Sequence, residues 1–566
     1  MRYWGIKNNK IKVTGDQVRY SHYYAFQGAV FDHSILYIPV SAENILAIMK
    51  NHPHDKDKDV YSPAFVEAAM KCLDEFRTDK GKLRALSNIN MKTIDNMPLL
   101  IKHKEPKPFK NQKIGLYWTK KFPEHGLMWE MGVGKTRTGV ETFILKYQQS
   151  KVNKCLVICP VSMLYKWVDE VEKWSDFSAI ALDGTRENKQ ELLNEDYDFY
   201  VINYESLTSL QAELLNKIDE NWMIIGDETT KIKNPYAKRS KSAVQIANCT
   251  KHKIILTGTP VTQNAYDLFN QFQFLDGGET FGLNYDQFID KYFWKSGFKV
   301  QPKYHALEQI SDLIYKKCTR FRKEECIDIP EKIYDIRKVH LTPYMQEVYD
   351  AMVQYAIAQI QKQADQSGIV KAPIVLTQLL RLSQITSGFV VDVDGKVTDF
   401  EDQPKLKAVQ DIMEESVKNN GNKLLVWARF QHDVEKIMKL CKKLDIWSVD
   451  LYGEVDRQQR EVNIKAFQTN NDCKVMVGTA GTGGFGIELT AANVVVYYSN
   501  SYSLEQRLQS EDRTHRAGLN HKIQYIDLLA DKTIDVPIYK ILKDKKKIAD
   551  LVTRDSIFAI TQGQLL

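Results

Sequence analysis

The stretch GLMWEMGVGKT (residues 126–136) decides the fold, because it joins a short apolar run to a glycine-rich loop and leads into a helical pattern. Such glycines let the backbone turn its N–H groups around phosphate oxygens, and the N-terminus of the next helix adds a favourable dipole. We expect Lys135 to reach the β- and γ-phosphates and the Thr136 hydroxyl to hold Mg²⁺. The usual pattern, G-x-x-x-x-G-K-[ST], has a glycine where this chain has Trp129. The stretch therefore indicates a nucleotide-binding strand, loop and helix; a glycine-rich helix entry is the alternative.

A second stretch, WMIIGDE (residues 222–228), ends an apolar run in two carboxylates. Parallel strands end at the edge of the sheet where ligands bind, so both carboxylates are expected there. Asp227 can hold magnesium through water, and Glu228 can orient and deprotonate the attacking water. An Asp-Glu pair is often only a cap or surface charge. After a phosphate loop it favours a nucleotide-hydrolysing site.

Short apolar runs recur on both sides of a long region with helical patterns. Runs that are apolar on both faces are typical of buried parallel strands. The first series is Leu156–Ile158, Tyr200–Ile202, Met223–Ile225 and Ile254–Leu256, and the second is Leu424–Val426, Val475–Val477 and Val494–Tyr497. The economical interpretation is an α/β protein with two parallel-sheet units and a helical insertion between them.

The composition allows a soluble protein of several domains. The chain has 566 residues, of which 43% are hydrophobic and 27% charged, and its net charge is +6. A mildly basic balance fits nucleic acid without establishing it. We see no membrane-length apolar run and no secretory signal, and the cysteines show no pairing pattern. Cys155 and Cys159 lie in an apolar run, which favours buried free thiols over a zinc site and a reducing cytoplasm as the location.

The predicted domain boundaries follow these patterns. Residues 1–100 form a separate block with strand-like and helical runs (helices near 41–50 and 63–77), and we expect a small α+β domain there. Its role stays open between a nucleic-acid surface and the docking of a protein partner. Residues 101–300 form the ATP-binding unit, residues 301–400 the helical insertion and linker, and residues 401–566 the second unit. In the last part, KILKDKKK (540–547) fits either a helix that braces the units or an exposed helix.

The order of the motifs resembles that of superfamily-two helicases and, within them, the Swi/Snf-type DNA translocases. The resemblance runs from about residue 105 to about residue 550. It implies two RecA-like parallel-sheet lobes. This chain has Thr230 where the family has His, and Glu488 where Asn is common. The resemblance rests on MWEMGVGKT (128–136), CLVICPVSMLYKWVDEVEKW (155–174), DETTKIKN (227–234), LTGTP (256–260), TRFRKEECIDIPEKI (319–333), LLRLSQITSG (379–388), KLLVWARFQ (423–431), LYGEVDRQQR (451–460), GTGGFGIELTAAN (481–493) and QSEDRTHRAG (509–518).

The resemblance also implies roles for individual residues. Gln112 matches the family's adenine-reading glutamine, and Arg513 and Arg516 match its arginine fingers; a salt-bridged helix is the alternative for the arginines. The implied catalytic residues are Lys135, Asp227, Glu228, Arg513 and Arg516, with Thr136 and Asp227 at the metal. The implied nucleotide contacts are Phe109, Gln112, Gly132, Val133, Gly134, Lys135, Thr136, Arg137, Gly486 and Glu488. The implied DNA contacts are Ser162, Lys166, Asn203, Arg381, Arg429, Tyr452, Gly453 and Arg457.

The function implied by the resemblance is an ATP- and Mg²⁺-dependent translocase on double-stranded or branched DNA. It would remodel protein–DNA complexes or DNA junctions, by fork or branch migration, and roles in repair, replication and recombination all fit. One alternative is a strand-separating DNA or RNA helicase, although no wedge hairpin stands out in the sequence. Another is a catalytically silent nucleic-acid scaffold. We expect a monomer without membrane contact, in the cytoplasm of a bacterial or phage-infected cell, or in a nucleus if the source is eukaryotic.

Overall fold

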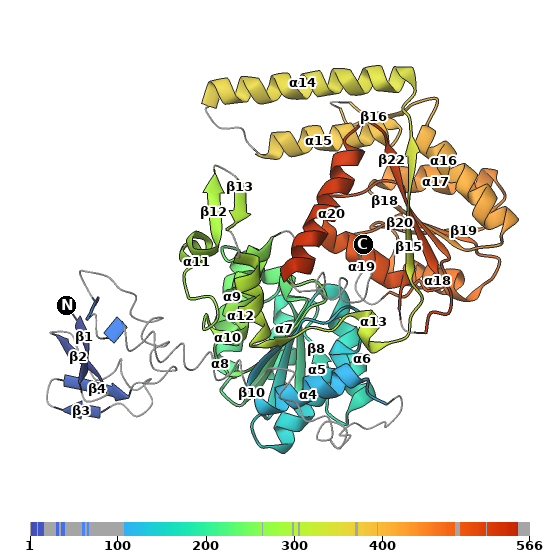
Figure 1. The fold of residues 1–566 in the computed structure, drawn as a ribbon. Helices are drawn as coiled ribbons and strands as arrows, with labels where there is room; N and C mark the ends of the chain where they lie inside the picture. The colour runs from blue at the N-terminus through green and yellow to red at the C-terminus, as the bar shows by residue number, and fades with distance from the viewer. Residues whose placement is uncertain are drawn as a thin grey trace.

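The computed structural model describes residues 107–552, apart from short gaps at 263, 297–298, 304–305, 368–371, 393, 482–486 and 517. Before residue 107 it describes 2–7, 10–15, 30–32, 35–39, 59–62 and 65–66. Figure 1 shows two α/β lobes, each with helices around a sheet. The two RecA-like parallel-sheet lobes expected from the sequence are confirmed. No helix of the described residues is long and apolar enough to cross a membrane.

The first lobe is built on a seven-stranded parallel sheet in the order β14-β6-β11-β10-β7-β9-β8. Its central strands are buried on both faces, which is why their sequences are continuous apolar runs. The strands are β6 (Glu124–Leu127), β7 (Lys154–Cys159), β8 (Ala179–Ala181), β9 (Phe199–Asn203), β10 (Trp222–Asp227), β11 (His252–Leu256) and β14 (Cys318–Thr319). The helices are α4 (Lys110–Lys121), α5 (Lys135–Gln148), α6 (Leu164–Trp174), α7 (Arg186–Asn194), α8 (Gln211–Lys217), α9 (Lys238–Ala247) and α10 (Leu268–Asp276).

A small extension follows α10 in the first lobe. It consists of α11 (Tyr285–Tyr292), the antiparallel hairpin β12 (Phe293–Ser296) and β13 (Lys299–Pro302), and α12 (Ala306–Tyr315). Figure 1 shows the hairpin standing out from the lobe. Phe293 is buried in the first-lobe core, whereas the neighbouring Trp294 is exposed, as expected for alternating side chains of a strand.

The second lobe is built on a six-stranded parallel sheet in the order β15-β22-β21-β18-β20-β19. The strands are β15 (Lys332–Val339), β18 (Leu424–Ala428), β19 (Ser448–Leu451), β20 (Val475–Thr479), β21 (Val494–Tyr497) and β22 (Ile523–Ala530). The helices are α16 (Pro404–Ile412), continued by a π-helical turn at Met413–Asn419, α17 (Gln431–Lys443), α18 (Arg457–Thr469), α19 (Leu504–Thr514) and α20 (Asp535–Val552).

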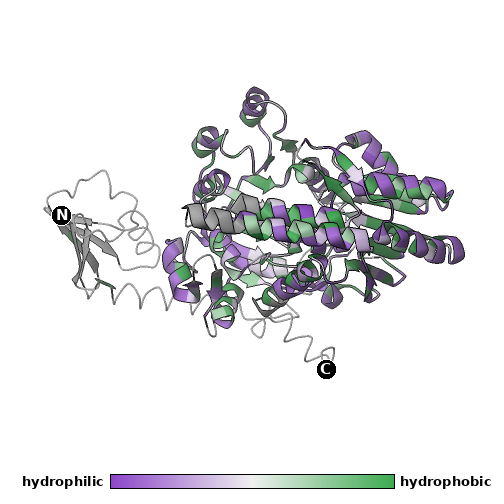
Figure 2. Cartoon of the chain, turned by 90° about the horizontal axis from the view of Figure 1, so that it is seen from above, coloured by the Kyte–Doolittle hydropathy of each residue, from purple (hydrophilic) through white to green (hydrophobic). Residues whose placement is uncertain are grey.

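The helical insertion projects from the second lobe. It comprises α14 (Pro343–Ser367) and α15 (Ala372–Thr386), followed by a small hairpin of β16 (Phe389–Val391) and β17 (Val397–Asp399). Figure 2 shows hydrophilic and hydrophobic residues mixed along the helices, as expected for helices with one face on a core. The predicted insertion range, 301–400, also contains β14 and β15. These two strands belong to the first and second sheets, so the lobes divide between residues 319 and 332.

The N-terminal block contains a five-stranded sheet in the order β3-β4-β2-β1-β5. The strands are β1 (Arg2–Lys7), β2 (Lys10–Gly15), β3 (Val30–Asp32), β4 (Ile35–Pro39) and β5 (Asp59–Tyr61). The helices expected near 41–50 and 63–77 lie outside the described residues, except for Phe65 and Val66, which are helical.

The C-terminal helix α20 contacts both lobes. Its Ile538 and Leu542 are buried with Leu504 of α19 in the second lobe, whereas Ile548 and Ala549 pack against the core of the first lobe. Helix α20 lies beside α12 of the first lobe. The segment 540–547 is therefore part of a helix that joins the lobes.

Candidate active site

The phosphate loop connects β6 to α5 at the carboxyl edge of the first sheet. Gly132 and Gly134 have φ angles of 83° and 84°, in the left-handed region that favours glycine. The buried Lys135 Nζ donates to the carbonyl oxygens of Trp129 and Glu130, at 2.9 and 3.0 Å. The loop is therefore already curved, and its lysine is held at the entrance of the loop.

Helix α4 is hydrogen-bonded to this loop through two side chains. Asn111 Nδ2 donates to the carbonyl of Val133 at 2.9 Å, and Gln112 Nε2 donates to the carbonyl of Gly134 at 3.1 Å. Gln112 Oε1 accepts the backbone N–H of Phe109 at 2.8 Å. The predicted adenine-reading glutamine thus lies directly against the phosphate loop.

The two carboxylates lie where β10 ends. Trp167 Nε1 donates to Asp227 Oδ2 at 2.8 Å, and Glu228 has a positive φ of 51°, a backbone conformation that is uncommon for residues other than glycine. Burial raises the pKa of Asp227, against the opposing effects of the Trp167 hydrogen bond and of Lys135. Burial, together with the neighbouring Asp227 and against the attraction of Lys135, raises the pKa of Glu228 to about 8. A carboxyl group with a pKa near neutral suits proton transfer.

One cavity of about 350 Å³ joins these groups and extends to the second lobe. Arg516 and Glu488 reach it from the second lobe, and Arg516 Nη1 lies 3.0 Å from Glu488 Oε1. Of the predicted site residues, the cavity is lined by Phe109, Gln112, Gly132, Gly134, Lys135, Thr136, Arg137, Lys166, Asp227, Glu228, Glu488 and Arg516. Val133 is fully buried behind the loop, and Gly486 lies outside the described residues.

The second predicted finger, Arg513, does not line this cavity. Its guanidinium carbon lies 5.3 Å from the centre of the Trp427 ring, and its carbonyl accepts the N–H of Leu489 at 2.8 Å. Burial lowers the pKa of Arg513 to about 10. The structure therefore brings only Arg516, of the two arginines, to the phosphate loop.

Helix α6 supplies cavity residues that sequence reasoning missed or assigned elsewhere. Lys166, predicted to contact DNA, lines the same cavity, and so does Trp174, whose ring stacks at 4.3 Å under the guanidinium of Arg137. Arg137 is further held by Glu141 at 2.9 Å. The signal in the sequence was the apolar spacing of Trp167 and Trp174, seven residues apart on one helix face.

The remaining predicted DNA residues lie in several places. Arg429, Tyr452 and Gly453 together line a cavity of about 450 Å³ at the carboxyl edge of the second sheet. Arg429 Nη1 donates to Ser383 Oγ of α15 at 3.2 Å, and Arg381 on the same helix donates to Gln384 at 3.2 Å. The other three predicted DNA residues are Ser162, Asn203 and Arg457. Ser162 is exposed in the 3-10 turn after β7, Asn203 is buried and caps the backbone N–H of Ser206, and the side chain of Arg457 lies outside the described residues.

Two parallel-sheet lobes, with a phosphate loop in one and an arginine of the other facing it, define a helicase-like two-lobed ATPase. A family model described as "SNF2-related domain" matches residues 111–387, and one described as "Helicase conserved C-terminal domain" matches residues 404–518. Together they cover the first lobe, the insertion and the second lobe up to residue 518. The chain therefore belongs to the SNF2-related family of helicase-like ATPases.

Individual relatives are distant. An uncharacterised ATP-dependent helicase of Mycoplasma genitalium is 26% identical over 455 residues, which are 78% of this chain and 41% of that protein. The protein p41 of Acyrthosiphon pisum secondary endosymbiont phage 1 is 24% identical, over 75% of this chain and 92% of its own length. The chain thus spans less than half of the Mycoplasma relative. A solved SWI2/SNF2 ATPase core of Sulfolobus solfataricus in complex with dsDNA is 25% identical over 81% of this chain and 95% of that chain, with a TM-score of 0.39.

Proposed function

We propose that this chain hydrolyses ATP with Mg²⁺ in the cavity between its lobes and uses the reaction to move along double-stranded DNA. The observation that carries the proposal is one cavity that holds Lys135, Asp227 and Glu228 of the first lobe together with Arg516 of the second. A site divided between two lobes links hydrolysis to their relative position.

The donor set fits a magnesium ion. The Thr136 hydroxyl and the Asp227 carboxylate line the same cavity, and they are oxygen donors of the kind that Mg²⁺ prefers. When bound, the ion would neutralise charge on the phosphates. Among the described residues, the buried Oε2 of Glu228 has no hydrogen-bond partner, which leaves it available to accept a proton from water.

The protein side chains divide the remaining work. Lys135 leaves the carbonyl oxygens of Trp129 and Glu130, which it contacts in this structure, and binds the terminal phosphates instead. Glu228 orients the attacking water and, in its ionised form, takes the proton of that water. Arg516 supplies positive charge to the transferring phosphoryl group from the opposite lobe, so turnover requires the lobes to be close. These intact groups speak against a catalytically silent scaffold.

Features of the second lobe support double-stranded DNA as the polymer along which the protein moves. Arg429, Tyr452 and Gly453 gather at a sheet edge beside the helical insertion, and a cationic side chain beside backbone N–H groups suits phosphate contacts. We propose remodelling of protein–DNA complexes or DNA junctions, in repair, replication or recombination, by a monomer with ATP and Mg²⁺. The relatives from Mycoplasma and from a phage support a bacterial or phage-infected cytoplasm, and the N-terminal sheet is a candidate for partner docking.

A strand-separating helicase is the second candidate because of one observation that the sequence did not reveal. The hairpin of β12 and β13 exposes Trp294, 65% of which is accessible to solvent, with Lys303 Nζ 4.5 Å from its ring. An exposed aromatic beside a cation can stack on an unpaired base.

The experiment that separates these functions compares ATP turnover on duplex, single-stranded and junction DNA and on RNA. We expect the strongest stimulation by duplex or junction DNA, and a decline with salt because phosphate contacts release counterions. Equal or stronger stimulation by RNA, or by single strands, would replace translocation on duplex DNA with the helicase function. Absence of turnover on every substrate would contradict both.

A further inference from the structure

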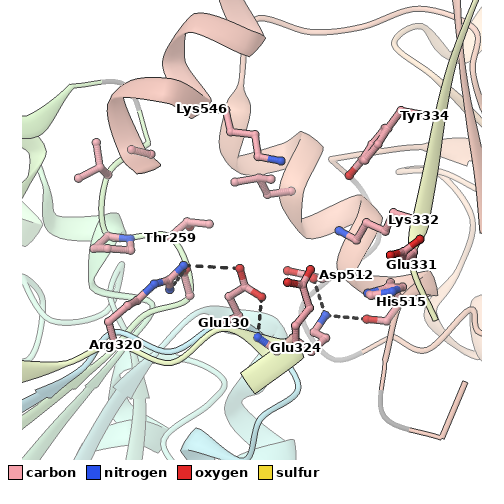
Figure 3. A pocket seen from close by; sticks show the side chains of 16 residues that line it. Glu130, Thr259, Arg320, Glu324, Glu331, Lys332, Tyr334, Asp512, His515 and Lys546 are labelled. Atoms are coloured by element: carbon pink, nitrogen blue, oxygen red, sulfur yellow. Dashed lines mark hydrogen bonds and ion pairs between the residues drawn. The ribbon is translucent and has the colours of Figure 1, made fainter. Parts of the chain in front are cut away.

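A buried lysine connects the two lobes beside the nucleotide cavity. Lys323 begins α13 (Lys323–Cys326) in the segment that leads from the first sheet to the second. Its Nζ donates to Asp512 Oδ1 and to the carbonyl of His515, both at 2.6 Å, and its side chain is 2% exposed. Figure 3 shows its partners Asp512 and His515 at the wall of an inter-lobe cavity of about 420 Å³, which Lys323 also lines.

The same lysine contacts the phosphate loop through its backbone. The Lys323 N–H donates to Glu130 Oε2 at 2.9 Å, while Arg320 Nη2 lies 3.5 Å from Glu130 Oε1. Burial alone would raise the pKa of the Glu130 carboxyl, but Arg320 and Lys323 outweigh burial and lower it. The backbone of Glu130 in turn accepts Lys135 at 3.0 Å. Glu130 therefore joins the phosphate-binding lysine to the inter-lobe segment.

On the second lobe, the partners of Lys323 flank the arginines. Asp512 and His515 stand at the end of α19, and the carbonyl of Asp512 accepts Arg516 Nε at 3.1 Å. Asp512 thus binds Lys323 with its carboxylate and Arg516 with its backbone. Fixing Asp512 fixes the base of the arginine that faces the nucleotide.

We infer that Lys323 is a positioning residue that holds the end of α19 against the phosphate loop, so that Arg516 reaches the nucleotide only while the Glu130–Lys323–Asp512 bridge is intact. The inference rests on the proposed hydrolysis of ATP. A buried ammonium that loses its carboxylate is costly, so the bridge is either fully formed or opened to water. The other described ion pair across the lobes near α19, Lys231 with Glu505 at 3.2 Å, is more exposed, with the lysine 33% accessible, and is expected to contribute less.

The test is a double-mutant cycle with Lys323→Met, Asp512→Asn and the double variant. Lys338→Met is the matched control, because Lys338 pairs with Asp531 at the surface and is 63% exposed. We expect each single variant to lower DNA-stimulated kcat by about 10-fold or more, since a small misplacement of a catalytic group is enough for such a loss. Nucleotide affinity should change little, and the double variant should be no slower than either single variant.

A second measurement does not depend on turnover. Amide hydrogen exchange of residues 504–515 in the unliganded proteins should be faster in Lys323→Met and in Asp512→Asn than in Lys338→Met. Additive losses of kcat, wild-type kcat in either single variant, or unchanged exchange would overturn the inference. If the wild-type chain hydrolysed no ATP, the proposed function would fail, and hydrogen exchange would still decide whether the bridge orders α19. Asp512→Asn answers the question if Lys323→Met does not fold, because Asp512 is nearer the surface, with 15% of its side chain exposed.

Discussion

The indole N–H of Trp167 donates to Oδ2 of Asp227 at 2.8 Å, from the middle of α6 to the end of β10. Trp167 is fully buried, so this hydrogen bond is shielded from solvent. The bond occupies one carboxylate oxygen and favours the ionised form of a carboxyl whose burial otherwise raises its pKa. It also connects the helix that follows Ser162 to the expected metal ligand.

Trp167→Phe should therefore weaken the use of magnesium. We expect the Mg²⁺ concentration for half-maximal ATP turnover to rise by about 10-fold, as for other losses of a hydrogen bond to a metal-binding carboxylate. The measurement is a magnesium titration of DNA-stimulated turnover. Trp222→Phe, at the opposite end of β10, is the control and should leave the titration unchanged; an unchanged titration in Trp167→Phe would contradict the role.

Replacing the phosphate-loop lysine and the carboxylate proposed as the general base should separate ATP binding from ATP hydrolysis. Lys135→Ala should abolish ATP binding because it removes the ammonium group that is held at the entrance of the phosphate loop. Glu228→Gln should bind ATP and fail to hydrolyse it. Fluorescent nucleotide titration and phosphate release measure the two effects, with the exposed Lys120→Ala as the control. Near-normal phosphate release by either variant would contradict the assignment of Lys135 and Glu228 to the active site.

The two arginines at the end of α19 should behave differently. Arg516→Ala should lower turnover by about 100-fold or more with ATP and DNA affinity retained, because its charge acts on the transition state. Arg513→Ala should instead lower the midpoint of thermal unfolding, because the guanidinium is buried against Trp427. A loss of about 1–3 kcal/mol in the free energy of unfolding is usual for such changes. Equal loss of turnover without loss of stability would assign Arg513 to catalysis as well.

Glu228 should make the stability of the fold depend on pH. Its pKa is raised from 4.5 to about 8, so between these values the folded chain holds a proton that the unfolded chain has lost. Stability therefore falls as pH rises through this window, and the loss is complete above about pH 8. Glu228→Gln should unfold at a higher temperature than the wild type at pH 9 and at a similar temperature at pH 4. Calorimetry measures this, and a constant difference at all pH values would contradict it.

The sequence predicted the groups that lie on backbone motifs better than those that depend on side-chain direction. Lys135 and Asp227 follow from a loop and a strand end, whose backbone fixes them. Arg513 and Lys166 face other surfaces than the ones expected. Arg513 lies in the last turn of α19 with its side chain beside Trp427, Arg516 follows the end of that helix, and Lys166 lines the cavity at the phosphate loop. The strand β15 escaped prediction because it lies at the sheet edge with mostly exposed, mixed residues (KIYDIRKV), and so lacks the apolar run of a central strand.

The long helix α14 gives small rotations of the second lobe a large effect at a distance. With 25 residues, at about 1.5 Å per residue, it is roughly 37 Å long. A lobe rotation of about 10°, modest for a rigid-body transition, would carry its far end through roughly 6 Å. On the proposed DNA track, that displacement approaches two base-pair steps of about 3.4 Å each. The insertion would thus work as a lever arm whose stroke is comparable to the spacing of the track.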